Sequence, residues 1–396
     1  MKPITILHVI DTLQTGGTES QLVRTLPRLD PQAFRQVVCL LRDVSWPTWL
    51  ATNGVETYPL GLSSKNSIIR GVWRLRRIID RVRPDLLHTH LFEATLIGRL
   101  AGRWARLPVV TTLVNTPYAE QWRRDDPRLN RLKVELVRVV DAATASWTIQ
   151  YIAISEVVRR FAVQDQRISP DRITVIHRGI AVDELPVFTA EQVQQVRQSL
   201  GYAPSDFLVL NVGRLVPQKG QQYLIAAMAQ LRNVLPQARL AIAGEGRQRA
   251  ALEAQIRARG LEGVARLLGD RRDVAALLAA ADAFAFPSVS EGFGVALLEA
   301  MAFGTPCITS DLDIVREVAG TESVVLVPPR SADALADAVV ALARDPERRR
   351  QLSAAAQRRA RTFDLNGAAR HLEEVYRRAV GPSGAPAPAL VGGGRA

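Results

Sequence analysis

Short apolar runs of strand length alternate with amphipathic helical patterns along nearly the whole chain, in two separate series. In the first half the expected strands are Ile4–Ile10, Val37–Leu41, Leu86–His90, Val109–Thr112 and Tyr151–Ile154. In the second half they are Phe207–Val212, Arg239–Ala243, Val264–Leu268, Ala283–Phe286 and Cys307–Thr309. Strands that alternate with helices form parallel sheets covered by helices. We therefore predict an α/β protein with two such sheets.

The two series are separated by a polar, proline-containing stretch, and this stretch sets the expected domain boundaries. We predict a Rossmann-like domain over 1–183, a linker over 184–205 and a second Rossmann-like domain over 206–362. The last segment, 381–396, is rich in Gly, Pro and Ala and is predicted to be disordered.

Composition narrows the class of protein. The chain is 47% hydrophobic and 23% charged, as soluble globular proteins are, and its longest apolar runs are shorter than a membrane span. The start of the chain lacks the apolar core of a signal peptide. Cys39 and Cys307 stand in separate apolar stretches without metal-ligand spacing, so buried free thiols are expected. These features predict a cytoplasmic protein.

The stretch Glu291-Gly-Phe-Gly-Val-Ala-Leu-Leu-Glu299 carries the most chemical information. It puts one carboxylate in a glycine-rich loop and the other two turns into the helix that follows. Gly292 and Gly294 allow the backbone to approach a ligand closely, and a helix start favours an anion. N–H groups for phosphate together with carboxylates for hydroxyl groups suit a sugar nucleotide.

With Pro287-Ser288 before it and Gly304-Thr-Pro306 after it, this stretch resembles the Glu-x7-Glu signature of family 4 glycosyltransferases. Three more blocks precede this stretch and fall in the family's order: Val212-Gly-Arg-Leu-Val-Pro-Gln-Lys-Gly220, Ile242-Ala-Gly-Glu-Gly246 and Leu268-Gly-Asp270 with Val274. The resemblance is dense over 205–330. In the first half it rests on Gly16-Gly17, Asp85…His88-Thr-His90 and Ile154-Ser155.

The resemblance implies the GT-B architecture, in which two Rossmann-like domains with parallel sheets face each other across a cleft. It also implies that the helical segment 363–380 crosses back to the first domain. The family's reaction is sugar transfer with retention of anomeric configuration.

The resemblance also implies roles for individual residues on the donor side. Arg214 and Lys219 are expected on the diphosphate, where fixed cations stabilise the charge of the leaving group. The Phe293 and Gly294 N–H groups, after Gly292, are expected to face the distal phosphate. Glu299 is expected on the ribose hydroxyls. Glu291 is expected beside the transferred sugar, as nucleophile, electrostatic stabiliser or hydroxyl acceptor.

On the other side of the expected cleft, Gly16 and Gly17 are expected near donor phosphate or acceptor, and His90 near the reaction centre. Local readings compete with these roles: a plain turn at the glycines and a packed histidine at 90. His8, His177 and His371 look scattered in the sequence, so no metal site is predicted. Asp311-Leu-Asp313 falls in a donor-loop segment of the family and is likewise given no metal.

Two departures from the family pattern fall on the acceptor side. Val114-Asn115 stand where members often carry His-Gly, and Arg178-Gly179 stand where members often carry Asn-Gly. The sequence therefore specifies the donor better than the acceptor.

Positive charge is the last sequence feature with a functional reading. The net charge is +12, most of it in residues 1–183. Residues 70–83 form a basic helical pattern whose apolar stripe is Val72, Leu75, Ile79 and Val82, with Trp73 off the stripe. Two roles are open for this helix, and they can coexist: docking on an anionic membrane surface, at the inner face of the cell membrane, and covering the sheet with its charges solvated.

We therefore predict a retaining, metal-independent hexosyltransferase that uses a nucleotide-diphosphate sugar as donor substrate and no cofactor. Its acceptor would be a sugar or a lipid-linked group, in cell-envelope, exopolysaccharide or glycolipid synthesis. The alternatives are a GT-B sugar-nucleotide epimerase, a phosphorylase, or a basic nucleic-acid-binding protein. No aromatic-interleaved basic motif supports the last, so no nucleic acid partner is expected.

Overall fold

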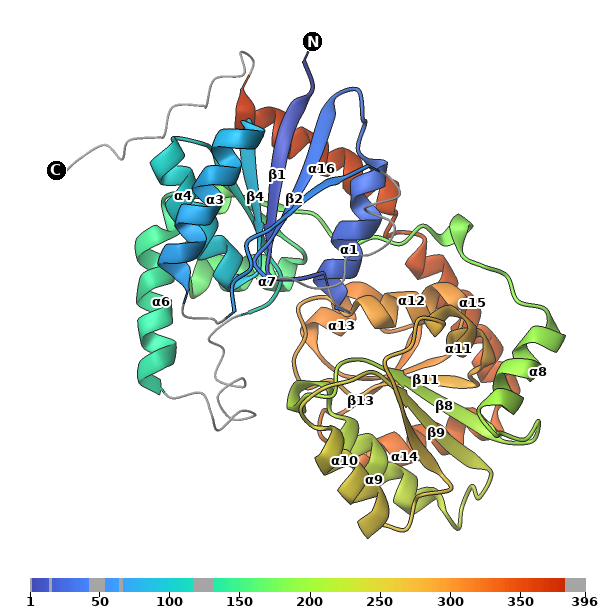
Figure 1. The fold of residues 1–396 in the computed structure, drawn as a ribbon. Helices are drawn as coiled ribbons and strands as arrows, with labels where there is room; N and C mark the ends of the chain where they lie inside the picture. Colours follow the sequence, from blue (N-terminus) through green and yellow to red (C-terminus); the bar gives the residue numbers. More distant parts are fainter. Residues whose placement is uncertain (1, 14–15, 43–53, 64–66, 117–130, 382–396) are drawn as a thin grey trace. The chain divides into compact units, whose positions relative to one another are not determined.

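The computed structural model describes residues 2–13, 16–42, 54–63, 67–116 and 131–381, with the side chains of 131–133 left aside. The chain divides into two compact units (Figure 1). The first unit includes residues up to Gly179 and the segment from Leu365 onward. The second unit includes Ile180–Asp364. The expected disordered tail, 381–396, lies outside the described residues except for Gly381.

The described part of the first unit is built on a parallel sheet with strand order β3-β2-β1-β4-β5-β6-β7. The strands are β1 Ile4–Ile10, β2 Phe34–Leu40, β3 Glu56–Pro59, β4 Leu86–His90, β5 Val109–Leu113, β6 Gln150–Ala153 and β7 Ile173–Val175. The helices are α1 Gly17–Thr25, α3 Ile68–Val82, α4 Phe92–Ala105, α6 Arg131–Ala145, α7 Glu156–Gln164 and α16 Leu365–Val380.

The described part of the second unit has a parallel sheet of order β10-β9-β8-β11-β12-β13. Its strands are β8 Phe207–Val212, β9 Ala238–Ala243, β10 Ala265–Gly269, β11 Ala283–Phe286, β12 Cys307–Ser310 and β13 Val324–Val327. Its helices are α8 Ala190–Ser199, α9 Gln221–Leu231, α10 Arg249–Ala258, α11 Val274–Ala280, α12 Val295–Phe303, α13 Asp313–Ala319, α14 Ala332–Arg344 and α15 Pro346–Ala360. The predicted pair of parallel α/β sheets is confirmed.

The two faces of the first sheet are covered by different helices. α1 and α16 cover one face, where Tyr376 is fully buried. α3 and α4 cover the other, and the α3 stripe Leu75, Ile79 and Val82 is buried there as the spacing predicts. Gly71 lets α3 approach α4, because a Cβ at this position would lie 2.6 Å from Ile97 Cδ1.

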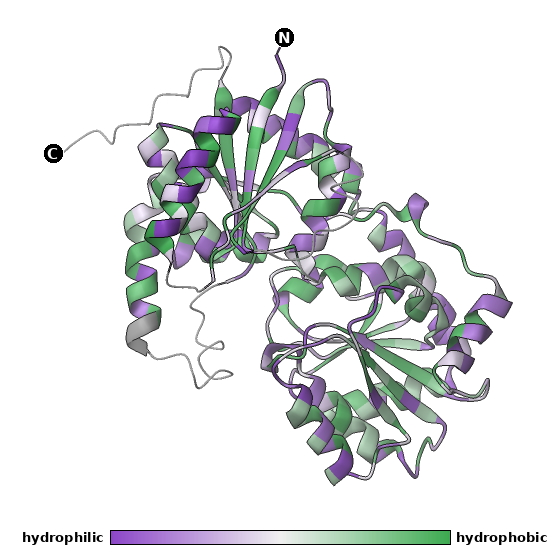
Figure 2. Ribbon diagram, in the orientation of Figure 1, coloured by the Kyte–Doolittle hydropathy of each residue, from purple (hydrophilic) through white to green (hydrophobic). Residues whose placement is uncertain are grey.

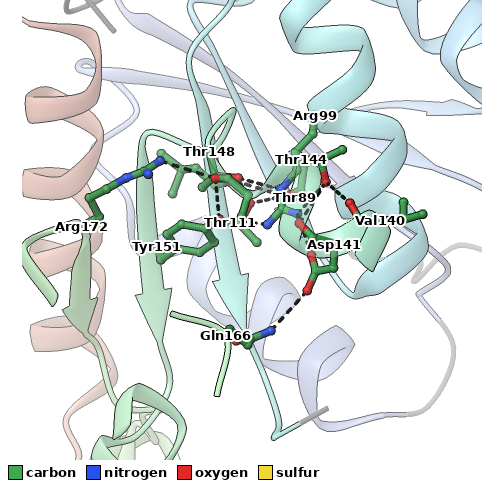
Figure 3. A network of polar contacts seen from close by, with 12 residues as sticks. Thr89, Arg99, Thr111, Val140, Asp141, Thr144, Thr148, Tyr151, Gln166 and Arg172 are labelled. Atoms are coloured by element: carbon green, nitrogen blue, oxygen red, sulfur yellow. Dashed lines mark hydrogen bonds and ion pairs between the residues drawn. The ribbon is translucent and has the colours of Figure 1, made fainter. Parts of the chain in front are cut away.

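A buried polar network attaches α6 to the sheet and to α4 (Figure 3). The Arg99 guanidinium, 3% exposed, lies 2.6 Å from Asp141 Oδ1 on α6. It also donates to Thr148 Oγ1 at 2.9 Å and to the Tyr151 hydroxyl at 3.1 Å. A buried guanidinium needs this many acceptors, since an unpaired buried charge is strongly destabilising.

The structure differs from the sequence prediction at the linker. The segment expected as linker, 184–205, contains α8, which packs against α11. Arg197 of α8 donates to the Ala280 carbonyl oxygen and to Asp282 Oδ2. The segment therefore belongs to the second unit, and the chain changes unit between Gly179 and Ile180. Polar composition suggested a linker, but these polar side chains make a surface helix.

Three strands were not predicted: β3, β7 and β13. Each is three or four residues long and lies at an edge of its sheet. Edge strands are short and only half-covered, so the apolar pattern that marks a central strand is weak or brief there.

Candidate functional site

In the second unit, the loops that follow β8 and β11 are joined. The Val289 N–H donates to the Gln218 carbonyl oxygen at 2.8 Å. Gly220, at φ 67°, begins α9, and a Cβ on it would collide with the Pro287 carbonyl oxygen. Only glycine fits both constraints. The predicted diphosphate loop and the predicted Glu-x7-Glu loop are therefore adjacent at the carboxyl ends of neighbouring strands, where α/β sheets bind ligands.

Lys219 and Glu291 form an ion pair at this junction, which the sequence analysis did not foresee. Lys219 Nζ donates to Glu291 Oε1, and Ser288 Oγ donates to the same oxygen at 2.7 Å. Both side chains are largely buried, 21% and 10% exposed. Lys219 Nζ also lies 5.5 Å from the centre of the Phe286 ring. The Lys219 ammonium and the Glu291 carboxylate are thus in contact where the two loops are joined.

The start of α12 is arranged as the spacing predicts. Gly294, at φ 91°, is the residue before the helix and has no side chain with which to cap it. Phe293 is buried at 3% exposure, with its ring 5.7 Å from the Phe363 ring. Gly292 is buried as well. A nine-residue helix that begins without a side-chain cap presents a partial positive charge suited to phosphate.

In the sequence, Arg214 comes before the residues of this junction and Glu299 comes after them. Glu299 is half-buried on α12, and Arg214 is exposed. Two hydrogen bonds fix the backbone of the loop that carries Arg214. Gln221 Nε2 donates to the Arg214 carbonyl oxygen at 3.1 Å, and the Leu215 N–H donates to the Glu245 carbonyl oxygen at 2.9 Å. The backbone is fixed while the guanidinium remains accessible, as binding of a phosphate requires.

In the first unit, Gly16 is the residue before α1, in extended conformation, and Gly17 is the first residue of that helix. A Cβ on Gly16 would lie 2.3 Å from Glu19 Oε2, so a side chain at this position would collide with the Glu19 carboxylate. Gln21 of α1 is joined to Gly179 by two hydrogen bonds, 3.0 and 3.3 Å long. This pair holds the 178–179 loop against α1.

Three histidines meet beside that loop, which contradicts the expectation that His8 is scattered. β1 and β4 pair so that His8 lies opposite His88, and His90 follows on the same face. Nitrogen atoms of the three rings lie within 4.8 Å of one another. His8 Nδ1 is 3.4 Å from His90 Nε2 and His8 Nε2 is 2.7 Å from Gln36 Oε1. The cluster was not predicted because His8 lies far from His88 and His90 in the sequence. The strands that carry them, β1 and β4, become neighbours only in the sheet.

Burial controls the charge of this cluster. It lowers the pKa of His8 to about 4 and holds the pKa of His88 and of His90 well below the usual range. The positive charge of Arg178 acts in the same direction on His88 and His90. The three imidazoles are therefore neutral at pH 7.

A cavity of about 40 Å³ lies against the cluster. His88 makes hydrogen bonds to the Tyr376 hydroxyl at 2.6 Å and to Thr112 Oγ1 at 2.7 Å. Two buried atoms lining the cavity, His90 Nδ1 and Arg178 Nη2, have no hydrogen-bond partner among the described residues. The space is large enough for a few waters, and a donor and an acceptor lining one cavity match a hydroxyl group.

A second cluster of polar side chains, close to the carboxyl ends of β1 and β2, was not predicted from the sequence. Arg42 pairs with Glu93 and lies 3.5 Å from Asp11. Asp11 Oδ1 accepts from the Ala94 N–H at 3.2 Å, which satisfies the start of α4. Burial and then the charge of Glu93 raise the pKa of Asp11 to about 6. An aspartate at the end of an apolar strand was the available sequence signal.

Asp311 makes two hydrogen bonds of 2.6 Å to the Arg316 guanidinium, and Asp313 is the first residue of α13. Cys39 and Cys307 are both buried and free, as predicted.

Two parallel α/β sheets, each with glycine-rich loops at the carboxyl ends of its strands, define a two-domain nucleotide-binding architecture. Comparison with known proteins supports this architecture and identifies the family. Residues 9–184 match the family described as Glycosyltransferase Family 4, and residues 192–359 match Glycosyl transferases group 1. The chain belongs to the family 4 glycosyltransferases and has their GT-B fold.

Individual relatives are similar over most or part of the chain. A Mycobacterium tuberculosis GDP-mannose-dependent alpha-(1-6)-phosphatidylinositol dimannoside mannosyltransferase is 31% identical over 301 residues, 74% of either chain. An Escherichia coli UDP-Gal:alpha-D-GlcNAc-diphosphoundecaprenol alpha-1,3-galactosyltransferase is 27% identical over 60% of this chain and 61% of its own. The crystal structure of Anabaena Alr3699/HepE with UDP-glucose superposes with TM-score 0.82 at 24% identity, over 94% of this chain and 99% of that one.

Among the described helices, none is both long and apolar enough to cross a membrane.

Proposed function

We propose that this chain transfers a hexose from a nucleotide-diphosphate sugar to an acceptor hydroxyl with retention of anomeric configuration. The observation that carries the donor assignment is the Lys219–Glu291 pair in the loop that leads through Gly294 into α12. The similar proteins named above include one whose name specifies GDP-mannose, one that specifies UDP-Gal and one crystallised with UDP-glucose. A pyrimidine or purine nucleotide is thus compatible with the proposal.

In the proposed reaction the diphosphate replaces Glu291 as the partner of Lys219. Arg214 and the N–H groups at the start of α12 share the developing negative charge, which is greatest as the glycosidic bond breaks. Release from Lys219 leaves Glu291 able to accept a hydroxyl hydrogen bond from the transferred sugar. Ser288 Oγ still donates to Glu291 Oε1 after that release and orients the carboxylate, and we assign Glu291 to sugar positioning.

The leaving phosphate is then the group that takes the acceptor proton, on the face that the leaving group occupies. Glu299 would hold the ribose hydroxyls, and Gly16 and Gly17 would allow close approach on the first-domain side. His90, with a neutral ring and an unpaired Nδ1, would accept a hydrogen bond from a substrate hydroxyl.

We propose further that the reaction needs no divalent metal. The two cations Lys219 and Arg214 supply positive charge. In the histidine cluster, His8 Nε2 already bonds Gln36, and both nitrogens of His88 bond Tyr376 and Thr112. The neighbouring charge of Arg178 also disfavours a second cation there.

The acceptor is proposed to be a sugar or lipid-linked group in envelope, exopolysaccharide or glycolipid synthesis, reached at the inner membrane face. Both relatives named above act, by their names, on lipid-linked acceptors.

The test is a transfer reaction with radiolabelled UDP- and GDP-hexoses and membrane lipid extract as acceptor. NMR of the product should show the donor's anomeric configuration, and activity should persist in EDTA. An inverted product would contradict the retaining mechanism. Loss of transfer in EDTA, restored by Mg²⁺ or Mn²⁺, would contradict metal independence.

A further inference from the structure

Two tryptophans on neighbouring helices of the first unit are exposed and in contact. Trp73 of α3 is 58% exposed and Trp104 of α4 is 50% exposed. Their ring centres are 5.0 Å apart in an edge-to-face arrangement. Ile69, four residues before Trp73 and so on the same face of α3, is 79% exposed. We call Ile69, Trp73 and Trp104 the tryptophan patch. Large apolar side chains gathered in this way mark a contact surface.

Arginines surround the tryptophan patch. Arg70 and Arg77 are exposed and lie one turn before and one turn after Trp73 on α3, and exposed Arg103 adjoins Trp104. The Arg76 guanidinium lies 5.9 Å from the centre of the Trp104 ring. The combination of exposed indoles with guanidinium groups predicts a partner that is apolar inside and anionic at its surface.

The structure also shows which arginines of this helix serve the fold. Arg74 donates to the Gly61 carbonyl oxygen at 2.9 Å, and Arg81 lies over the Tyr58 ring at 5.3 Å. Arg76 pairs with Asp80. Arg70, Arg77 and Arg103 are therefore the appropriate charges to assign to a partner.

The tryptophan patch is part of one exposed helical layer. α3 and α4 cover the same face of the sheet, and Arg99 joins α4 to α6. In the described part of the chain, six of the eight large exposed hydrophobic side chains lie on these three helices: Ile69, Trp73, Phe92, Trp104, Leu136 and Val139. Figure 2 shows α6 largely in the hydrophobic colour and α3 with hydrophilic residues between hydrophobic ones.

We propose that the tryptophan patch, with Arg70, Arg77 and Arg103, docks this protein on an anionic lipid bilayer. Indole rings favour the headgroup level of a bilayer, where the ring is partly buried and its N–H stays hydrated. Arginines beside them pair with lipid phosphates, each adding to attachment in a salt-dependent way. A polynucleotide fits less well, because Ile69 offers nothing to a phosphate backbone or a base edge. The inference deepens the proposed lipid-linked acceptor and does not depend on the donor site.

The experiment is sedimentation of the full chain with vesicles of phosphatidylcholine alone or with about one third phosphatidylglycerol, at low and high salt. The wild type should pellet with anionic vesicles at low salt and leave them at high salt. The charge-reversing double variant Arg70→Glu and Arg77→Glu should partition onto anionic vesicles at least about tenfold more weakly than the wild type. Arg348→Glu with Arg358→Glu, two exposed arginines on α15 of the second unit, makes the same charge change and should leave partitioning as it was.

Tryptophan fluorescence tests the aromatic part separately. Anionic vesicles should shift the wild-type emission to the blue. The double variant Trp73→Phe and Trp104→Phe should lose this shift, although four of the six tryptophans remain. Phenylalanine preserves the apolar contact and circular dichroism checks the fold. Loss of the shift without loss of fold therefore assigns insertion to these two rings.

Several results would overturn the proposal. They are equal pelleting with neutral and anionic vesicles, no pelleting with either, or equal loss in the α15 control. If a single-stranded oligonucleotide displaced the vesicles from the same arginines, the surface would be assigned to nucleic acid instead. Thermal stabilisation by UDP or GDP, measured on the same variants, reports the donor site independently. A failed docking test with normal nucleotide stabilisation thus leaves the proposed transfer reaction intact.

Discussion

At the residue scale, the main consequence of the structure is that Lys219 has two tasks. It is expected to hold the donor diphosphate, and without ligand it neutralises Glu291, whose side chain is only 10% exposed. Arg214 has the first task without the second, because its side chain is exposed. The two cations should therefore behave differently when they are removed.

Lys219→Ala and Arg214→Ala should each lower transfer by about 10²–10³, as loss of a group that stabilises a developing anion does. Only Lys219→Ala should also lower stability, by about 1–3 kcal/mol, since Glu291 loses its charged partner. Initial rates and thermal unfolding of both variants measure this. Adding Glu291→Gln to Lys219→Ala should recover most of the stability. Transfer at the wild-type rate in either single variant would remove that residue from the diphosphate site.

Glu291→Gln tests the proposed exchange of partners at Lys219. The amide cannot compete with phosphate for the ammonium, so free UDP or GDP should bind this variant several-fold more tightly. Transfer should fall by about 10², because an amide accepts the sugar hydroxyl less strongly than a carboxylate. Titration calorimetry gives the first quantity and initial rates give the second. Weaker nucleotide binding in Glu291→Gln would argue that the ion pair supports the loop instead of competing with the ligand.

At the scale of elements, α6 depends on one buried ion pair. Asp141→Ala removes the carboxylate that neutralises Arg99, whose guanidinium is 3% exposed (Figure 3). The expected loss is about 3–5 kcal/mol in the free energy of unfolding. The double variant with Arg99→Met should lose much less, because the charge is removed along with its partner. Denaturant unfolding of the two variants decides, and equal losses would show that packing alone secures α6.

The strands β1 and β4 and the helix α16 share a pH-sensitive junction at the histidine cluster. His8 faces Gln36, His88, His90 and Tyr376, and burial lowers its pKa from 6.5 to about 4. The unfolded chain therefore binds the proton more readily between these two values. Stability contributed by the neutral ring is complete above about pH 6.5 and is lost as pH falls towards 4.

The first unit should accordingly lose on the order of 2–3 kcal/mol through His8 as pH falls over this window. His8→Asn should flatten the dependence of unfolding free energy on pH between 6.5 and 4.5, whatever its effect at pH 7. Urea unfolding at several pH values measures the slope. An unchanged slope in His8→Asn would mean that His8 is already charged in the folded protein.

How much of this arrangement was accessible from sequence differs between elements. The central strands β1, β4, β8 and β11 were located at their correct bounds, because buried parallel strands are continuous apolar runs flanked by loops. The edge strands β3, β7 and β13 and the helix α8 were missed, since their side chains are half-exposed and the pattern is weak. Contacts across strands, such as His8 with His88, depend on sheet order, which the spacing of residues along the chain does not encode.

For the whole molecule, the site and the fold lead to the same class of protein. The family match covers both units, and the second carries the loops predicted to bind the donor. The sequence departs from the family pattern on the acceptor side, at Arg178 among other positions, so it predicts a donor nucleotide site more specifically than an acceptor.

The central claim is that the loop of Lys219 and the start of α12 bind a nucleoside diphosphate. The most direct measurement is titration calorimetry of UDP, GDP and ADP into the wild type, Lys219→Ala and the surface control Arg348→Glu, without added metal. The account predicts that at least one nucleotide binds the wild type and the control alike. It also predicts that the same nucleotide binds Lys219→Ala at least about tenfold more weakly, as loss of a charge-assisted hydrogen bond requires. Undiminished binding of that nucleotide to Lys219→Ala would contradict the account.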